Sequence, residues 1–117
     1  MTIFYVAIGG AIGAVIRYLV VLGVSFPMGT LAVNVIGSFL MGLAFVWLMA
    51  KGMDRVMLLL MTGVLGGFTT FSAFSLDVLR LVEDGRISGA VLYVAGSVLL
   101  SLVAIFVAVS IARAVVS

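Results

Sequence analysis

The stretch GVLGGFTTFSAFS, residues 63–75, interrupts an otherwise apolar segment of the sequence. A glycine pair beside two threonines is poor material for a regular helix, because each Gly costs about 1 kcal/mol relative to Ala. Irregular backbone at membrane depth survives only where protein or a polar cavity satisfies the freed carbonyl groups. We therefore expect a helix that breaks here, with carbonyl groups that could bind a small hard cation. Gly63 and Gly67 are spaced four apart, which also suits close helix packing, and both interpretations stay open.

The composition around this stretch places the chain in a membrane. Of its 117 residues 66% are apolar, while Lys and Arg total six and Asp and Glu total four. Soluble domains average about 25% charged residues, and so short a chain exposes much of its surface when it folds alone. A soluble globular domain and a disordered chain are therefore excluded. At about 20 residues per span, the length holds four spans in a single transmembrane domain, residues 1–117.

Three short connections separate the expected spans. One contains the only proline, Pro27, and the other two are charged turns, KGMDR at 51–55 and EDGR at 83–86. The spans are continuously apolar rather than alternating, which favours helices over a barrel and predicts an all-α membrane protein. The four expected transmembrane helices cover about residues 2–24, 30–50, 56–82 and 87–116.

The basic residues are divided evenly between the two ends of these spans. With an even number of spans, the N-terminus, the 51–55 turn and the C-terminus share one side. That side holds Lys51, Arg55 and Arg113, and the other holds Arg80, Arg86 and, if it extends to its nearer interface, Arg17. The positive-inside rule needs an excess to fix orientation, so we expect protomers inserted both ways, as an antiparallel dual-topology homodimer. The alternative is a single orientation set by the two charges of the 51–55 turn.

Several classes of function are excluded by residue types that the chain lacks. There is no Cys and no His, which removes thiolate nucleophiles and the commonest metal ligand. No nucleophile–base pair can be assembled, so an enzyme is not expected, and without a basic cluster neither is a nucleic-acid partner. Asp77, near one end of the third span, is the only candidate intramembrane carboxylate, and Arg80 on the same helix face is its expected partner.

The other polar side chains within the spans are mostly neutral donors, which suit an anion better than a cation. Tyr93, Ser97 and Ser101 follow an i, i+4, i+8 spacing and therefore share one face of the last span. Such a stripe can pass an ion along a pore or bond neighbouring helices together. Asn34 is likewise a candidate ligand for the permeating ion, or it forms an interhelical hydrogen bond. Arg17 can extend its charged end to the membrane interface or hold anions at a vestibule.

Phe71 and Phe74 are spaced three apart in the third span and are interleaved with hydroxyls such as Ser72. The spacing places both rings on one helix face. The positive edge of an aromatic ring can face an anion that has lost its water. Packing against lipid or in the protein core is the alternative role for this pair.

These features together resemble the Fluc (CrcB-type) fluoride channels over essentially the whole chain. The motifs that carry the resemblance are GAVIRY at 13–18, GTLAVN at 29–34, GVLGGFTTFSAFS at 63–75 and the serine stripe of the last span. The resemblance implies antiparallel dual-topology homodimers in a bacterial or archaeal plasma membrane. It further implies two fluoride pores, each built from both protomers, and a central Na⁺ held by backbone carbonyls at the break in the third helix.

The same resemblance implies roles for individual residues of this chain. The pore residues would be Asn34, Phe71, Ser72, Phe74, Tyr93, Ser97 and Ser101, with Arg17 near the vestibule and Gly66 and Thr69 as the Na⁺ carbonyls. Two positions depart from the family pattern, since Ala73 stands where it usually has Thr and Asp77 where it has Glu. A small dual-topology multidrug exporter is a rival that predicts a carboxylate in the first span, which this span lacks. The second rival function is that of a non-conducting assembly subunit of a membrane complex.

Overall fold

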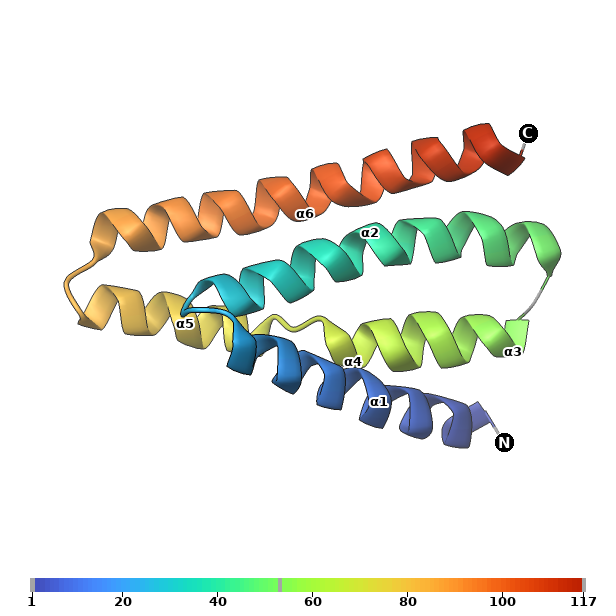
Figure 1. Ribbon diagram of the computed structural model, residues 1–117, viewed down its shortest axis with the longest axis horizontal. Helices are drawn as coiled ribbons and strands as arrows, with labels where there is room; N and C mark the ends of the chain where they lie inside the picture. Colours follow the sequence, from blue (N-terminus) through green and yellow to red (C-terminus); the bar gives the residue numbers. More distant parts are fainter. Residues whose placement is uncertain (1, 53, 117) are drawn as a thin grey trace.

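The protein is described here by a computed structural model that covers residues 2–52 and 54–116. Four helical segments in this part of the chain are long and apolar enough to cross a membrane, which confirms the predicted all-helical architecture. They lie side by side in a flat body of 49 × 32 × 20 Å (Figure 1). The elements are α1 (Thr2–Gly23), α2 (Met28–Lys51), α3 (Asp54–Met57), η1 (Leu58–Leu65), α4 (Gly66–Phe68), α5 (Ser72–Glu83) and α6 (Ile87–Val116).

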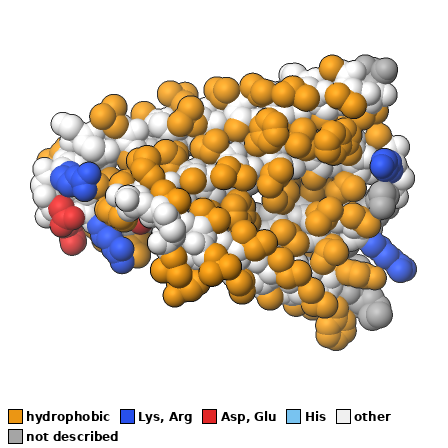
Figure 2. All heavy atoms as spheres, in the orientation of Figure 1, with side chains coloured by type: hydrophobic (Ala, Val, Ile, Leu, Met, Phe, Trp, Pro, Cys, Tyr) orange, Lys and Arg blue, Asp and Glu red, His pale blue; other side chains and the backbone are white. Residues whose placement is uncertain are grey.

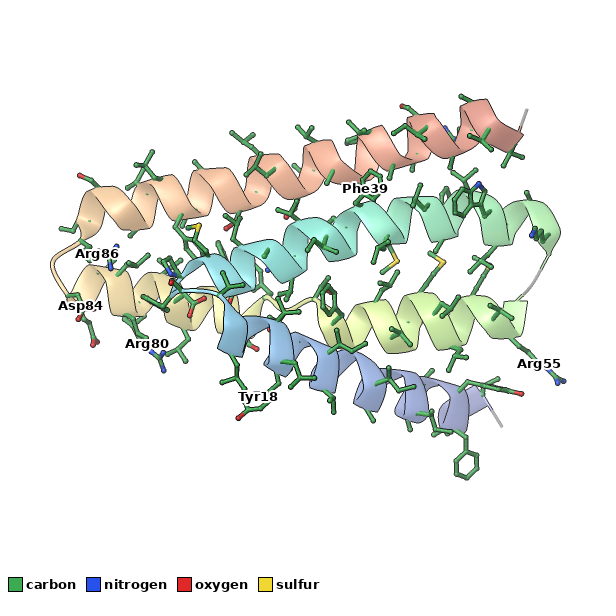
Figure 3. The ribbon with its side chains drawn as sticks, in the orientation of Figure 1. Tyr18, Phe39, Arg55, Arg80, Asp84 and Arg86 are labelled. Atoms are coloured by element: carbon green, nitrogen blue, oxygen red, sulfur yellow. The ribbon has the colours of Figure 1, made fainter. Side chains whose placement is uncertain are left out.

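The surface is apolar along the body and charged at its two ends. Figure 2 shows apolar side chains over most of the visible face, with the charged ones gathered at opposite ends. Arg55 lies at the end of the molecule where α1 begins and α6 ends (Figure 1 and Figure 3), whereas Arg80, Asp84 and Arg86 lie at the other end. This arrangement fits a lipid belt around the middle, where every backbone polar group must be satisfied inside the protein.

The third segment is a helix with an interruption, as the glycine–threonine stretch predicts. Its first part runs from α3 through the π-helical η1 to α4, and the second part is α5. Between them Thr69 adopts an extended conformation, with φ −84° and ψ 156°. Wider π-type turns are frequent at functional sites, and here one leads directly into the break.

Helix α1 packs against the first part of this segment with almost no side chain between the two backbones. A Cβ atom added to Gly9 would lie 2.5 Å from the carbonyl oxygen of Leu59, and one on Gly67 would lie 2.6 Å from that of Gly10. A Cβ on Gly63 would lie 2.9 Å from the Cα of Gly9. The close packing that the glycine spacing allowed is therefore present, on the same segment as the break.

Helices α2 and α6 pack along most of their lengths on the other side of the molecule. Gly42 permits this approach, because a Cβ there would lie 2.8 Å from the carbonyl oxygen of Ile105. Beyond the break, α5 packs on α6 through a buried cluster of Phe74, Leu81, Ala90 and Tyr93, against which Leu31 of α2 also packs. The break is thus held between α1 on one side and the α2–α6 pair on the other.

Candidate functional site

A groove of about 510 Å³ lies between α2, the break and α6. Most residues that the sequence analysis assigned to the site border it, although they come from segments far apart in the chain. Those bordering it are Asn34, Gly66, Thr69, Phe71, Phe74, Ser97 and Ser101. Three others, Arg17, Ser72 and Tyr93, do not border it.

The groove also has walls that the sequence analysis missed. Gly37, Ser38 and Met41 border it from α2, at three, four and seven residues after Asn34. This is the spacing of a single helix face, so extending the face from Asn34 would have found them. The other missed residues are Thr70, Val98 and Ile105.

Asn34 holds the backbone of the break with both ends of its amide. Its Nδ2 donates to the Thr70 carbonyl oxygen at 2.8 Å, and its Oδ1 accepts from the Thr70 N–H at 2.8 Å. The two bonds fix the orientation of the amide and satisfy two backbone groups that a broken helix leaves free. The Asn34 Nδ2 carries a second N–H, and neither of the two bonds to Thr70 uses it. The Asn34 side chain borders the groove.

The hydroxyl groups at the break are largely engaged in local hydrogen bonds. Thr69 Oγ1 donates to the Leu65 carbonyl oxygen at 2.9 Å. Thr70 Oγ1 accepts from the Ala73 N–H at 3.2 Å and lies 3.2 Å from Ser72 Oγ. Thr70 therefore caps the start of α5, in the manner of Ser and Thr at helix N-termini. Ser72, which was predicted in the pore, belongs to this exposed hydroxyl pair and does not border the groove.

The carbonyl oxygens at the break differ in whether a donor reaches them. Thr70 accepts from Asn34 as described, and Gly67 accepts from Arg17 Nε at 3.2 Å. Within the described part of the chain, no hydrogen-bond donor reaches the carbonyl oxygens of Gly66 and Thr69. Both residues border the groove. Unsatisfied carbonyls at a helix break are the ligand type that small hard cations take in discontinuous membrane helices.

Three aromatic rings are in contact from the break to α6, and two of them, Phe71 and Phe74, border the groove. The ring centroids of Phe71 and Phe74 lie 5.4 Å apart, and those of Phe74 and Tyr93 lie 5.3 Å apart. Phe74 is 8% exposed and belongs to the core, whereas Phe71 is 76% exposed. One ring of the predicted pair is therefore fixed by packing, while the other projects from the surface beside the groove.

The hydroxyl groups of the predicted stripe on α6 differ in whether they have a hydrogen-bond partner. Tyr93 donates to Asp77 Oδ2 at 2.9 Å in a buried pair, so the partner of this carboxylate is Tyr93 and not the expected Arg80. Ser97 is also buried, yet its Oγ has no hydrogen-bond partner among the described residues. Buried polar groups are nearly always paired, and this hydroxyl borders the groove together with Ser101.

A discontinuous helix beside a groove that carries several polar groups, inside a small four-span bundle, is an architecture found in membrane proteins that bind small ions. Residues 4–109 match the family model described as "CrcB-like protein, Camphor Resistance (CrcB)", and the chain belongs to this family. This confirms the resemblance that the motifs indicated and makes the chain a multi-pass membrane protein.

Curated relatives cover nearly the whole chain and carry one name, fluoride-specific ion channel FluC. The relative from Rhizobium etli is 49% identical in an alignment of 120 positions that covers 95% of each chain. The relative from Agrobacterium fabrum is 47% identical in an alignment of 122 positions that covers 97% of each chain. The relative from Ruegeria sp. is 49% identical in an alignment of 125 positions that covers 100% of this chain and 98% of the relative. The name describes a channel and not an enzyme.

Proposed function

We propose that this protein is a fluoride-selective channel through which fluoride leaves the cytoplasm passively, down its electrochemical gradient. The observation that carries the proposal is the groove, which gathers Asn34, Phe71, Phe74, Ser97 and Ser101 beside a helix break. Membership of a family whose curated relatives are named fluoride-specific ion channels supports the choice of ion.

The groove offers the chemistry that a dehydrated fluoride needs. Fluoride is small and strongly hydrated, so a pore must replace its water with donors that are already in place. The Ser97 hydroxyl has no hydrogen-bond partner among the described residues and can donate to an anion without first breaking a bond. The Asn34 amide is fixed and has a second N–H that its bonds to Thr70 do not use, and aromatic ring edges add weak positive potential. Because these groups are neutral and separate, each site binds weakly enough for the ion to leave.

The same observations lead us to propose that the working unit is an antiparallel homodimer with two such pores. Phe71 is 76% exposed beside the groove, where a second copy can cover the ring and close the path. The balanced basic charge at the two ends favours insertion in both orientations. C-terminal fusion to one reporter active only inside the cell and to another active only outside tests this. Signal from both reporters is expected, and signal from only one would contradict dual topology.

A central Na⁺ fits the carbonyls of Gly66 and Thr69, which no donor reaches within the described residues. Oxygen ligands of this kind suit a hard cation. A bound cation would supply a fixed positive potential near the anion path, at a depth where screening by water is weak. Gly66 and Thr69 would hold it through backbone oxygens, so the site needs no acidic side chain.

Reconstitution into liposomes tests the function directly. Liposomes that contain only this protein are loaded with fluoride, and efflux is followed with a fluoride-selective electrode and, separately, with a chloride electrode. We expect fast fluoride efflux and chloride efflux at the level of protein-free liposomes. A multidrug exporter or a non-conducting subunit would leave fluoride inside, and that result would overturn the proposal.

A further inference from the structure

Arg17 is the single charged residue of α1, and its partner is a backbone carbonyl. The side chain is half-buried, and its Nε donates to the Gly67 carbonyl oxygen at 3.2 Å. It does not border the groove. A charged group within a spanning helix is costly unless it is paired, so the position of Arg17 beside the break requires a physical reason.

The Gly67 carbonyl is one of the groups that the break exposes. In a regular helix it would accept from the N–H of the residue four positions later, but α4 ends at Phe68 and helix resumes only at Ser72. Arg17 supplies the donor that the backbone no longer provides. The carbonyl also lies in the last turn of the helical run, where the partial negative charge of a helix C-terminus favours a cation.

Two side chains therefore fix the break from opposite sides. Arg17 reaches Gly67 from α1, and Asn34 reaches Thr70 from α2. In Figure 1, α1 crosses the third segment beside α4, next to the interruption, where the two elements are in contact. The short run between the two bonded residues contains Thr69, whose carbonyl has no donor within the described residues.

We infer that Arg17 is a positioning residue, which holds the break in its groove-forming shape through Gly67 and makes no contact with the permeating ion. The inference rests on the proposed function and assigns one residue a role within it. It differs from the vestibule role expected from sequence, in which the charge itself attracts anions. The two roles make different demands on the side chain, because a hydrogen bond depends on donor position and attraction depends on charge.

Three substitutions of Arg17 separate the need for a hydrogen-bond donor from the need for a charge. Arg17→Gln places an amide nitrogen at the same number of bonds from Cα as Nε, so it keeps a donor without the charge. Arg17→Met has the same reach and neither donor nor charge. Arg17→Lys keeps the charge but moves the donor one bond further out. Fluoride efflux from liposomes is measured for each at low and at high ionic strength.

For a positioning residue, we expect Arg17→Met to lower efflux by at least about tenfold, the size expected for loss of a hydrogen bond to a charged donor. Arg17→Gln should retain most of the efflux, at either ionic strength. If Arg17→Gln and Arg17→Met are equally impaired at low salt and their difference from the wild type disappears at high salt, where the wild-type charge is screened, the residue acts through its charge and the inference is overturned. Wild-type efflux from Arg17→Met would overturn it as well.

Amide hydrogen exchange gives a readout that is independent of conduction. Peptides covering residues 66–71 should exchange faster in Arg17→Met than in the wild type, and at the wild-type rate in Arg17→Gln. Unchanged exchange in Arg17→Met would overturn the inference even if the proposed function failed for the wild type. If Arg17→Met does not fold, Arg17→Gln and Arg17→Lys decide between the positioning role and the charge role. Wild-type efflux from Arg17→Gln supports positioning, and a defect in Arg17→Gln with normal Arg17→Lys contradicts it.

Discussion

The two faces of the third segment differ in how closely other elements approach them. Toward α1, a Cβ on Gly67 would lie 2.6 Å from the Gly10 carbonyl oxygen, so the backbones are in direct contact. Toward the groove, the nearest atom to a Cβ on the adjacent Gly66 is the Met61 carbonyl oxygen, at 3.5 Å. One face is closed by contact and the other is left open beside polar groups. Gly67 therefore serves the packing of the fold, whereas the neighbouring Gly66 borders the site.

Substituting each glycine of this pair gives the largest expected difference. Gly67→Ala forces a methyl group into the α1 backbone, and overpacking of this kind costs about 1–3 kcal/mol or more. We expect most of the folded protein to be lost, measured as the fraction that elutes as a folded species in detergent and as its thermal unfolding midpoint. Gly66→Ala is the matched control and should fold normally. Equal damage from both substitutions would remove the contrast between the two faces.

Asn34→Asp should abolish most conduction while leaving the protein folded. The carboxylate can no longer donate to the Thr70 carbonyl, a bond of 2.8 Å in the wild type, and it places a negative charge beside the groove. Loss of one hydrogen bond together with repulsion of the ion should lower fluoride efflux about 100-fold. Efflux close to wild type would show that neither the amide nor the groove lies on the ion path.

Phe71→Ile tests whether the projecting ring belongs to the path. Because Phe71 is 76% exposed, its replacement should leave the stability of the protomer nearly unchanged and lower fluoride efflux about tenfold, as expected for loss of a ring-edge contact with a desolvated ion. Phe106, which is 69% exposed on α6, provides the control. Phe106→Ile should conduct normally, and equal effects of the two changes would indicate a general response to lost surface area.

Ser97→Ala should produce the smallest effect, with opposite signs for stability and conduction. Its buried hydroxyl has no partner among the described residues, so its removal should raise the free energy of unfolding by up to about 1 kcal/mol. Fluoride efflux should fall only a few-fold, since other donors line the groove. Ser110→Ala, at an exposed position on the same helix, should change neither quantity. A loss of stability in Ser97→Ala would mean that the hydroxyl is bonded within the protein.

The four spans and the break could be predicted from the sequence, because each depends on local chemistry. Continuous apolar runs indicate spanning helices whatever their neighbours are, and a glycine pair beside Thr69 and Thr70 weakens a helix by itself. The π-helical form of η1 was not predicted, since an apolar run from Leu58 to Leu65 carries no periodic signal that separates it from an α-helix.

The hydrogen bonds of the site could not be predicted, because they join residues far apart in the chain. The Asp77 carboxylate was assigned to Arg80 by helical spacing, but a buried partner 16 residues away, Tyr93, reaches it instead. Likewise, the bond between Arg17 and Gly67 spans 50 positions. Side-chain spacing identifies a helix face, but only the packing of α1, α2 and α6 around the break decides which atoms meet.

Fluoride efflux per folded protein, measured with an electrode on proteoliposomes, tests the central claim most directly. The comparison is between the wild type and the double variant Asn34→Asp/Phe71→Ile, which changes the groove at two points and leaves the glycine contacts with α1 intact. We predict rapid efflux from the wild type and efflux at the protein-free level from a double variant that still folds. Wild-type efflux from the double variant would show that the groove is not the path of the ion.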